Sequence, residues 1–302
     1  MTEFVMHDTT AILREIVRLP KEQRGQVIRE KIIAPFQGMF AAMRPRTGDQ
    51  NLAAGTDADI EMARGWMMLP PDDGGADYLA ALDRLENAQV SAAALHALER
   101  AEAAFAQAGI DTRLDRVQAG VFPLPPGNPQ IAASRGYTGF GGIAGYIVMM
   151  LWPDEYTLPR LPAATVHELN HQVRFNYYPM GWNVSVREYL VAEGLAESFA
   201  GSLYGSELIG PWVSEHSPES LARSKEIIGK ALDVRGFNAV RGYIFGDASA
   251  RQLNLPVTGL PDFAGYVVGY HLVQAFLHLT GRSAVEATIL PAEEIVAEAG
   301  YF

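Results

Sequence analysis

The stretch "HELNH" at residues 167–171, followed by "EGLAE" at residues 193–197, decides how this chain is interpreted. His167 and His171 are four residues apart, so on a helix they share one face and both imidazoles can reach one ion. Glu168 would lie beside that ion, where its carboxylate can take a proton from bound water. The pattern predicts one Zn²⁺ per chain. A histidine pair packed in a helical core, matched by chance, is the alternative.

The neighbouring sequence favours the metal site. Val166, Leu169 and Val173 give residues 162–176 an apolar side, which predicts a helix. A catalytic zinc needs a third protein ligand, and Glu193 on a second expected helix, 187–203, can supply it.

That second helix carries another acidic residue one turn later. Glu197 is expected to accept a hydrogen bond from the distal nitrogen of a ligand histidine, which would fix the tautomer of that ring. An exchange of roles between Glu193 and Glu197 remains open.

Composition excludes several other classes of protein. The formal charge is −11 with no basic stripe, which argues against nucleic-acid binding, and the absence of cysteine excludes thiolate chemistry. The N-terminus lacks a basic-then-apolar leader, and the longest apolar runs, such as 144–152, are too short to span a membrane. A cytoplasmic protein with no membrane partner is expected, while the sequence gives no indication of oligomeric state.

The pattern along the chain indicates an α+β protein that is predominantly helical. Residues 1–110 are predicted to form a helical region, with a loop at 44–56, and residues 111–302 a mixed domain with a small sheet. Strands are expected at 116–122 and within 136–155. Further helices are expected at 217–232, with Ser217 as N-cap, at 264–279, and after the capping box "SAVE" at 283–286.

These motifs together resemble a known family. "GFGG" (139–142), "HELNHQVR" (167–174), "EGLAE" (193–197) and "GYVVGY" (265–270) are similar, in this order, to a bacterial family of predicted zinc-dependent proteases within the gluzincin clan. The resemblance implies a zincin-like catalytic domain at 111–302 behind the helical region. Metzincins are excluded, because Arg174 and Tyr177 stand where that pattern needs Gly and His.

The resemblance also implies a role for the glycine-rich strand. In zincins the strand before the metal helix forms the sheet edge, and an extended peptide pairs with it. Residues 143–150 are the candidate edge strand, and an ordinary core strand is the alternative. The substrate-binding residues expected from this are Gly141, Gly142, Ile143, Ala144 and Gly145.

The helix expected at 262–279 offers donors for an oxyanion. Its pattern is similar to the tyrosine-bearing helix of thimet-type oligopeptidases, which favours Tyr266, with Tyr270 and His271 as rivals. Aromatic core packing is the alternative for each tyrosine. Gly265 and Gly269 are expected to permit close helix packing.

Two further residues have open assignments. Arg174, one turn beyond His171, is expected to buttress the site, to bind a substrate carboxylate, or to form a plain salt bridge. His216 is expected to be an exposed bystander.

The function expected is a zinc metallopeptidase with Glu168 as general base, acting on a peptide or small amide. The Gly-Ala-Met-Glu-Asn motif of the zinc aminopeptidases is absent, which favours cleavage of internal bonds or short peptides. Hydrolysis of a non-peptide amide or ester is one alternative. A catalytically silent metal-binding or regulatory protein is another, and a fourth ligand from His216 or His271 would favour it.

Overall fold

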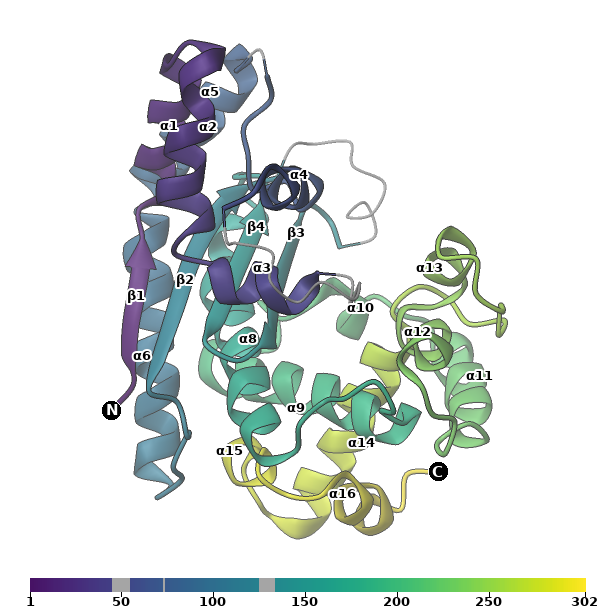
Figure 1. Cartoon of the computed structure of the whole chain (residues 1–302). Helices are drawn as coiled ribbons and strands as arrows, with labels where there is room; N and C mark the ends of the chain where they lie inside the picture. Colours follow the sequence, from purple (N-terminus) through teal and green to yellow (C-terminus); the bar gives the residue numbers. More distant parts are fainter. Residues whose placement is uncertain (45–54, 73, 125–133) are drawn as a thin grey trace. The chain divides into compact units, whose positions relative to one another are not determined.

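The computed structural model describes residues 1–44, 55–72, 74–124 and 134–302 (Figure 1). Within them the chain forms two compact units, one of residues 1–99 and 115–165 and one of residues 100–114 and 166–302. The division expected at residue 110 coincides with none of the three boundaries between these units. The loop expected at 44–56 lies mostly outside the described residues.

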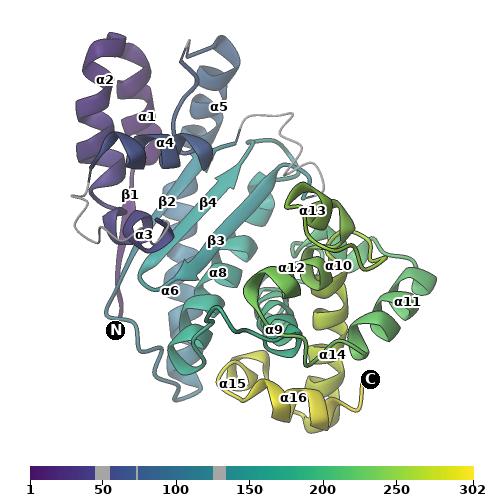
Figure 2. The same cartoon turned by 45° about the vertical axis from the view of Figure 1, so that its right-hand side comes forward.

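A four-stranded sheet lies in the first unit (Figure 2). Its order is β1 (Glu3–His7), β2 (Arg116–Pro123), β4 (Tyr146–Leu151), β3 (Tyr137–Ile143). β1 and β4 both run parallel to β2, whereas β3 is antiparallel to β4. The strand expected at 116–122 is therefore confirmed.

Two expectations about this sheet are wrong. The first hundred residues are not all helical, because Glu3–His7 pairs with a strand more than a hundred residues away, a partner that local periodicity does not reveal. Residues 143–150 are not the edge strand either. Gly145, at φ +84°, turns the chain between β3 and β4, so β4 has partners on both sides and β3 is the edge.

Helices cover one face of this sheet. The helices of the first unit are α1 (Thr9–Arg18), α2 (Lys21–Ile28), η1 (Arg29–Ile33), α3 (Gln37–Met43), α4 (Asp57–Gly65), α5 (Ala76–Asn87) and η2 (Leu158–Arg160), together with the start of α6 (Val90–Gln107) up to residue 99 and of α8 (Leu161–Tyr177) up to residue 165. Phe36 and Phe40 pack in one buried cluster with Phe122 of β2 and with Val148 and Met150 of β4. Alternation along β4 thus directs Val148 and Met150 to the same face.

The second unit is helical in its described part. Its elements are α8 (Leu161–Tyr177, from residue 166 on), α9 (Val186–Tyr204), α10 (Pro211–Ser214), α11 (Pro218–Gly229), α12 (Phe237–Phe245), α13 (Asp247–Gln252), α14 (Ala264–Thr280), α15 (Ala284–Ala287) and α16 (Ala292–Ala299), together with the end of α6 (Val90–Gln107). The helices expected at 162–176, 187–203, 217–232 and 264–279 are confirmed to within three residues. No described helix has the length and apolar character needed to cross a membrane.

Side-chain caps fix where several of these helices begin. Ser185 and Glu188 form a capping box at the start of α9, and Ser283 and Glu286 form the expected one at α15. Ser217 accepts from the Ser220 amide at the start of α11, as expected. Each cap satisfies an amide that the first helical turn leaves without a partner.

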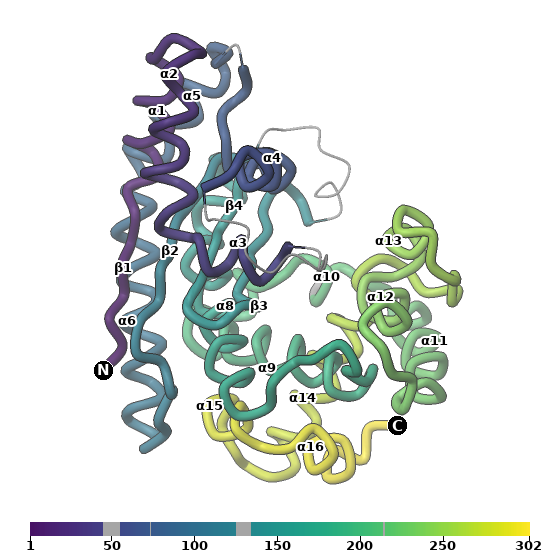
Figure 3. Tube along the Cα trace, viewed as in Figure 1, coloured from purple at the N-terminus to yellow at the C-terminus, as the bar shows by residue number. Residues whose placement is uncertain are grey.

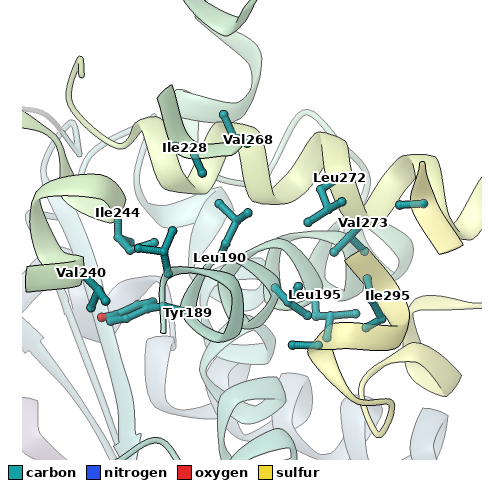
Figure 4. Close-up of a cluster of buried hydrophobic side chains, with 14 of the residues drawn as sticks. Tyr189, Leu190, Leu195, Ile228, Val240, Ile244, Val268, Leu272, Val273 and Ile295 are labelled. Atoms are coloured by element: carbon teal, nitrogen blue, oxygen red, sulfur yellow. The ribbon is translucent and has the colours of Figure 1, made fainter. Parts of the chain in front are cut away.

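Helices α9 and α14, traced in Figure 3, share one buried hydrophobic cluster with residues of α11, α12 and α16 (Figure 4). Leu190 and Leu195 of α9 pack in one cluster with Val268, Leu272 and Val273 of α14. Glu193, the expected third ligand, lies on α9 beside this cluster.

Candidate metal centre

Helix α8 presents both motif histidines from a buried stretch. Val166, Leu169 and Val173 are fully buried, as expected, and hold the helix in the core. His167 and His171 are 9% and 6% exposed, and their rings lie edge to face with centroids 4.7 Å apart. The i, i+4 spacing therefore brings the two imidazoles together on one face.

Glu193 of α9 completes a group that could hold a metal ion. Its Oε2 lies 3.3 Å from Nε2 of His167 and 3.3 Å from Nε2 of His171. In the described part of the chain, these three residues form the cluster of ligand types suited to a cation.

The spacing of these atoms fits zinc. Two ligands at ordinary Zn–N and Zn–O distances in a tetrahedral arrangement lie about 3.4 Å apart, close to the two separations observed here. Glu193 Oε2 is buried and makes no hydrogen bond to the described residues, although a buried carboxylate oxygen normally needs a donor. A cation bound between the three side chains would satisfy this oxygen.

Electrostatics within the group point the same way. Burial alone raises the pKa of Glu193, but the charge of His171, the approach of both imidazole rings to 3.3 Å and the charge of His167 outweigh it and lower the pKa to about 2. Burial lowers the pKa of His167, whereas Glu193, Glu197 and Glu168 together raise it to about 9. Without a metal, the carboxylates therefore hold a proton on His167, and a cation would take its place.

Glu197 lies on the other side of the His167 ring. Its Oε1 is 3.7 Å from His167 Nδ1, while Glu193 faces Nε2 of the same ring. Glu197 also accepts hydrogen bonds from Trp212 Nε1 at 2.9 Å and from the Gly210 amide at 3.2 Å. Two donors thus hold the carboxylate of Glu197 beside the His167 ring, and its expected orienting role stays a prediction.

The three oxyanion candidates on α14 differ in their surroundings. Burial raises the pKa of Tyr266 well above its ordinary value, and the charges of Glu193, Glu168 and Glu197 add to this. Burial raises the pKa of Tyr270, and the charge of Glu197 raises it further. Burial and the neighbouring His216 instead lower the pKa of His271. Tyr266 is thus the candidate closest in its electrostatics to the ligand group.

His216 is not an exposed bystander. Its Nε2 lies 3.2 Å from Nε2 of His271, and the two rings meet edge to face. The segment after α10 packs on α14, which the sequence around His216 does not reveal. Neither histidine belongs to the ligand group found among the described residues.

Arg174 acts on the backbone rather than on a carboxylate. It is 2% exposed, and its Nη1 donates to the carbonyls of Thr288 and Leu290 at 2.9 and 3.1 Å. Burial lowers the pKa of Arg174 to about 10. The side chain therefore ties the metal helix to the segment between α15 and α16.

Two aromatic neighbours of the site were not expected from the sequence. Trp212 on α10 holds Glu197 and also contacts the Tyr266 ring. Tyr189 lies one turn before Glu193 on α9. This four-residue spacing could have indicated from the sequence that Tyr189 lies beside the site. No comparable signal exists for Trp212, because its position depends on how α10 packs against α14.

The expected substrate-binding residues lie in the first unit. Gly141, Gly142 and Ile143 are in β3, the edge strand, and Ala144 and Gly145 form the turn to β4. Their role in binding substrate remains a prediction.

Comparison with known proteins agrees with the ligand geometry. Residues 91–297 match the family described as Predicted Zn-dependent protease (DUF2268). The chain is also 35% identical over 304 residues to the uncharacterized protein YjfC of Bacillus subtilis (strain 168), a match that covers 99% of this chain and 98% of YjfC. No solved structure matches. A zincin-like fold therefore remains a prediction, while an α+β chain rich in helix is observed.

Proposed function

This chain belongs to the family of predicted Zn-dependent proteases, and on that premise we propose that it is a zinc metallopeptidase. The observation that carries the proposal is the position of Glu193 Oε2, 3.3 Å from Nε2 of both His167 and His171. These three side chains would hold one Zn²⁺.

The bound ion would supply Lewis acidity, which brings the pKa of a coordinated water close to neutrality. Glu168 follows His167 directly and is 7% exposed. In the proposed reaction its carboxylate accepts the proton from the attacking water and later delivers it to the leaving amine. Glu197 keeps the His167 ring oriented through Nδ1 during both transfers.

Tyr266 is our proposed donor to the oxyanion of the scissile carbonyl. The charges of Glu193, Glu168 and Glu197 all raise its pKa in addition to burial, which supports this choice. Its raised pKa keeps the hydroxyl protonated, as a hydrogen-bond donor must be. Tyr270 and His271 are the rival donors.

The substrate we propose is a peptide cleaved internally or near an end, because the aminopeptidase anchoring motif is absent from the sequence. The β3 edge, with Gly141 and Gly142, is proposed to pair with extended peptide. A purely structural metal is less well supported, since such zinc sites normally have four protein ligands and the described residues supply three.

Metal analysis combined with hydrolysis tests the proposal. Protein purified without chelators should contain about one zinc per chain by mass spectrometry, and His171→Ala and Glu193→Ala should lose it. Glu168→Gln should keep its zinc but lose hydrolysis of a quenched fluorescent peptide library by about 10²–10⁴-fold. A folded protein that contains no zinc and refuses added zinc would contradict the proposal.

A further inference from the structure

Arg241 of α12 has an unusual environment. Its Nε is buried and has no hydrogen-bond partner, and no ion pair of its guanidinium occurs among the described residues. The guanidinium carbon instead lies 5.5 Å from the ring centroid of Phe237 and 5.6 Å from that of Phe245.

These ring contacts do not replace the missing acceptor. Both distances are close to the roughly 6 Å limit of a cation–π interaction, so their contribution is small. A buried donor without an acceptor destabilises the folded protein, because it has lost its hydrogen bond to water and gained none in return. An acceptor supplied by a bound molecule would explain why a guanidinium is kept at this position.

Ring contacts connect Arg241 with residues beside the metal centre. The Phe245 ring, which Arg241 contacts, is also 5.9 Å from the ring of Tyr189 and 5.9 Å from the ring of Tyr266. Tyr189 points from α9 toward α12 (Figure 4). Both tyrosines border the ligand group, so a single ring links that group to the guanidinium.

The charges that act on Tyr189 follow from the same proximity. Burial raises its pKa, the negative charge of Glu193 raises it further, and the positive charge of Arg241 lowers it. A molecule bound at the metal centre and extending past Tyr189 would therefore reach the guanidinium.

We propose that Arg241 binds a carboxylate of the peptide substrate, and specifically the free C-terminal carboxylate of a short peptide cleaved at the metal centre. This inference rests on the proposed function. A guanidinium pairs with a carboxylate through two parallel hydrogen bonds, which gives both strength and orientation. Glu168, Glu193 and Glu197 repel a second negative group, so a substrate carboxylate needs a fixed cation to be held nearby.

Equilibrium binding separates this inference from hydrolysis. Zinc-loaded Glu168→Gln would be titrated by calorimetry with acetyl-Ala-Ala-Phe-Leu as the free acid and as the amide. We expect the free acid to bind about tenfold more tightly or better. In the double variant with Arg241→Met the ratio should fall to about one.

Matched variants and peptides control the experiment. Arg223→Met removes the same charge from an exposed position on α11 and should leave the ratio unchanged. Arg241→Lys keeps the charge but loses the planar group that donates two parallel hydrogen bonds, so it should retain only part of the preference for the free acid. If Arg241→Met does not fold, Arg241→Lys takes its place in the comparison. Amidated peptides ending in Asp and in Asn distinguish a side-chain carboxylate from the terminal one.

The outcomes are distinct. An unchanged acid-to-amide ratio in Arg241→Met, equal binding of both peptides by Glu168→Gln, binding of neither, or a preference for the Asp side chain alone would overturn the inference. If the preference depends on Arg241 but the zinc-loaded wild type hydrolyses no peptide, the proposed function fails while the carboxylate site stands.

Discussion

Gly194 and Gly269 lie where α9 and α14 cross with their backbones in contact. A Cβ on Gly194 would overlap the carbonyl group of Gly269, and a Cβ on Gly269 would overlap the carbonyl oxygen of Leu190. Because Gly194 directly follows Glu193, this crossing fixes the proposed third ligand against the helix that carries Tyr266. The expectation of close packing at Gly269 is confirmed.

Gly194→Ala should therefore destabilise the fold and the metal site together. The added methyl group meets backbone, which cannot move aside, so we expect a loss of about 1–3 kcal/mol in the free energy of unfolding and weaker zinc binding. Urea unfolding and zinc titration measure the two effects. Gly201→Ala on the same helix is the control: its Cβ would lie 3.6 Å from Ile209, an ordinary contact, and should cost nothing. Equal stability of the two variants would contradict this account.

Trp212 should affect zinc affinity without binding the ion. Trp212→Phe keeps an aromatic ring but removes the 2.9 Å hydrogen bond to Glu197, which faces His167. Loss of such an outer partner typically weakens metal binding about 10–100-fold, and we expect a value in that range from competition with a chelator. Trp182→Phe, at a 72% exposed position, should leave zinc affinity unchanged. If both variants bind zinc like the wild type, Trp212 does not act through Glu197.

The sequence was sufficient for the parts of the site that depend on helical spacing. His167 and His171 share a face because they are four apart, and Glu193 and Glu197 follow at one-turn spacing on the next helix. The rest depends on contacts between distant segments. β1 needs a partner strand beyond residue 115, and His216 meets His271 because the segment after α10 packs on α14. No local periodicity encodes such contacts.

Zinc binding should weaken as the pH falls. The pKa of His167 in the metal-free protein is about 9, so at neutral pH a proton must leave before zinc can bind. The apparent affinity should fall up to about tenfold for each pH unit below 9, and calorimetry in buffers of different ionisation enthalpy should detect about one released proton. For the metal-free fold the sign is opposite. A His pKa raised above 6.5 stabilises the protein fully below pH 6.5, and this contribution is lost as the pH rises through about 9. Affinity that does not change between pH 6 and 8 would contradict the prediction.

Arg174 should matter for stability more than for chemistry. Arg174→Met leaves the carbonyls of Thr288 and Leu290 without their buried donor, which should cost about 2–4 kcal/mol of unfolding free energy. Arg282→Met is the control, because its ion pair with Glu294 is partly exposed and should contribute less than about 1 kcal/mol. Chemical denaturation would compare the two. A catalytic defect in Arg174→Met at wild-type stability would instead favour a role in substrate binding.

The tyrosine that donates to the oxyanion can be identified by removing one hydroxyl at a time. Tyr266→Phe should lower kcat about 10²–10³-fold with little change in KM, since the hydrogen bond forms chiefly in the transition state. Zinc content should stay at the wild-type value, because the hydroxyl is not a ligand. Tyr270→Phe is the matched control on the same helix. Burial and the charge of Glu197 raise the pKa of Tyr270, whereas Glu193 and Glu168 are not among the causes. Its kcat should therefore change less than about tenfold. Steady-state kinetics on one peptide, with metal content measured on the same samples, separates the two tyrosines. A larger loss in Tyr270→Phe than in Tyr266→Phe would transfer the donor role to Tyr270, one turn further along α14.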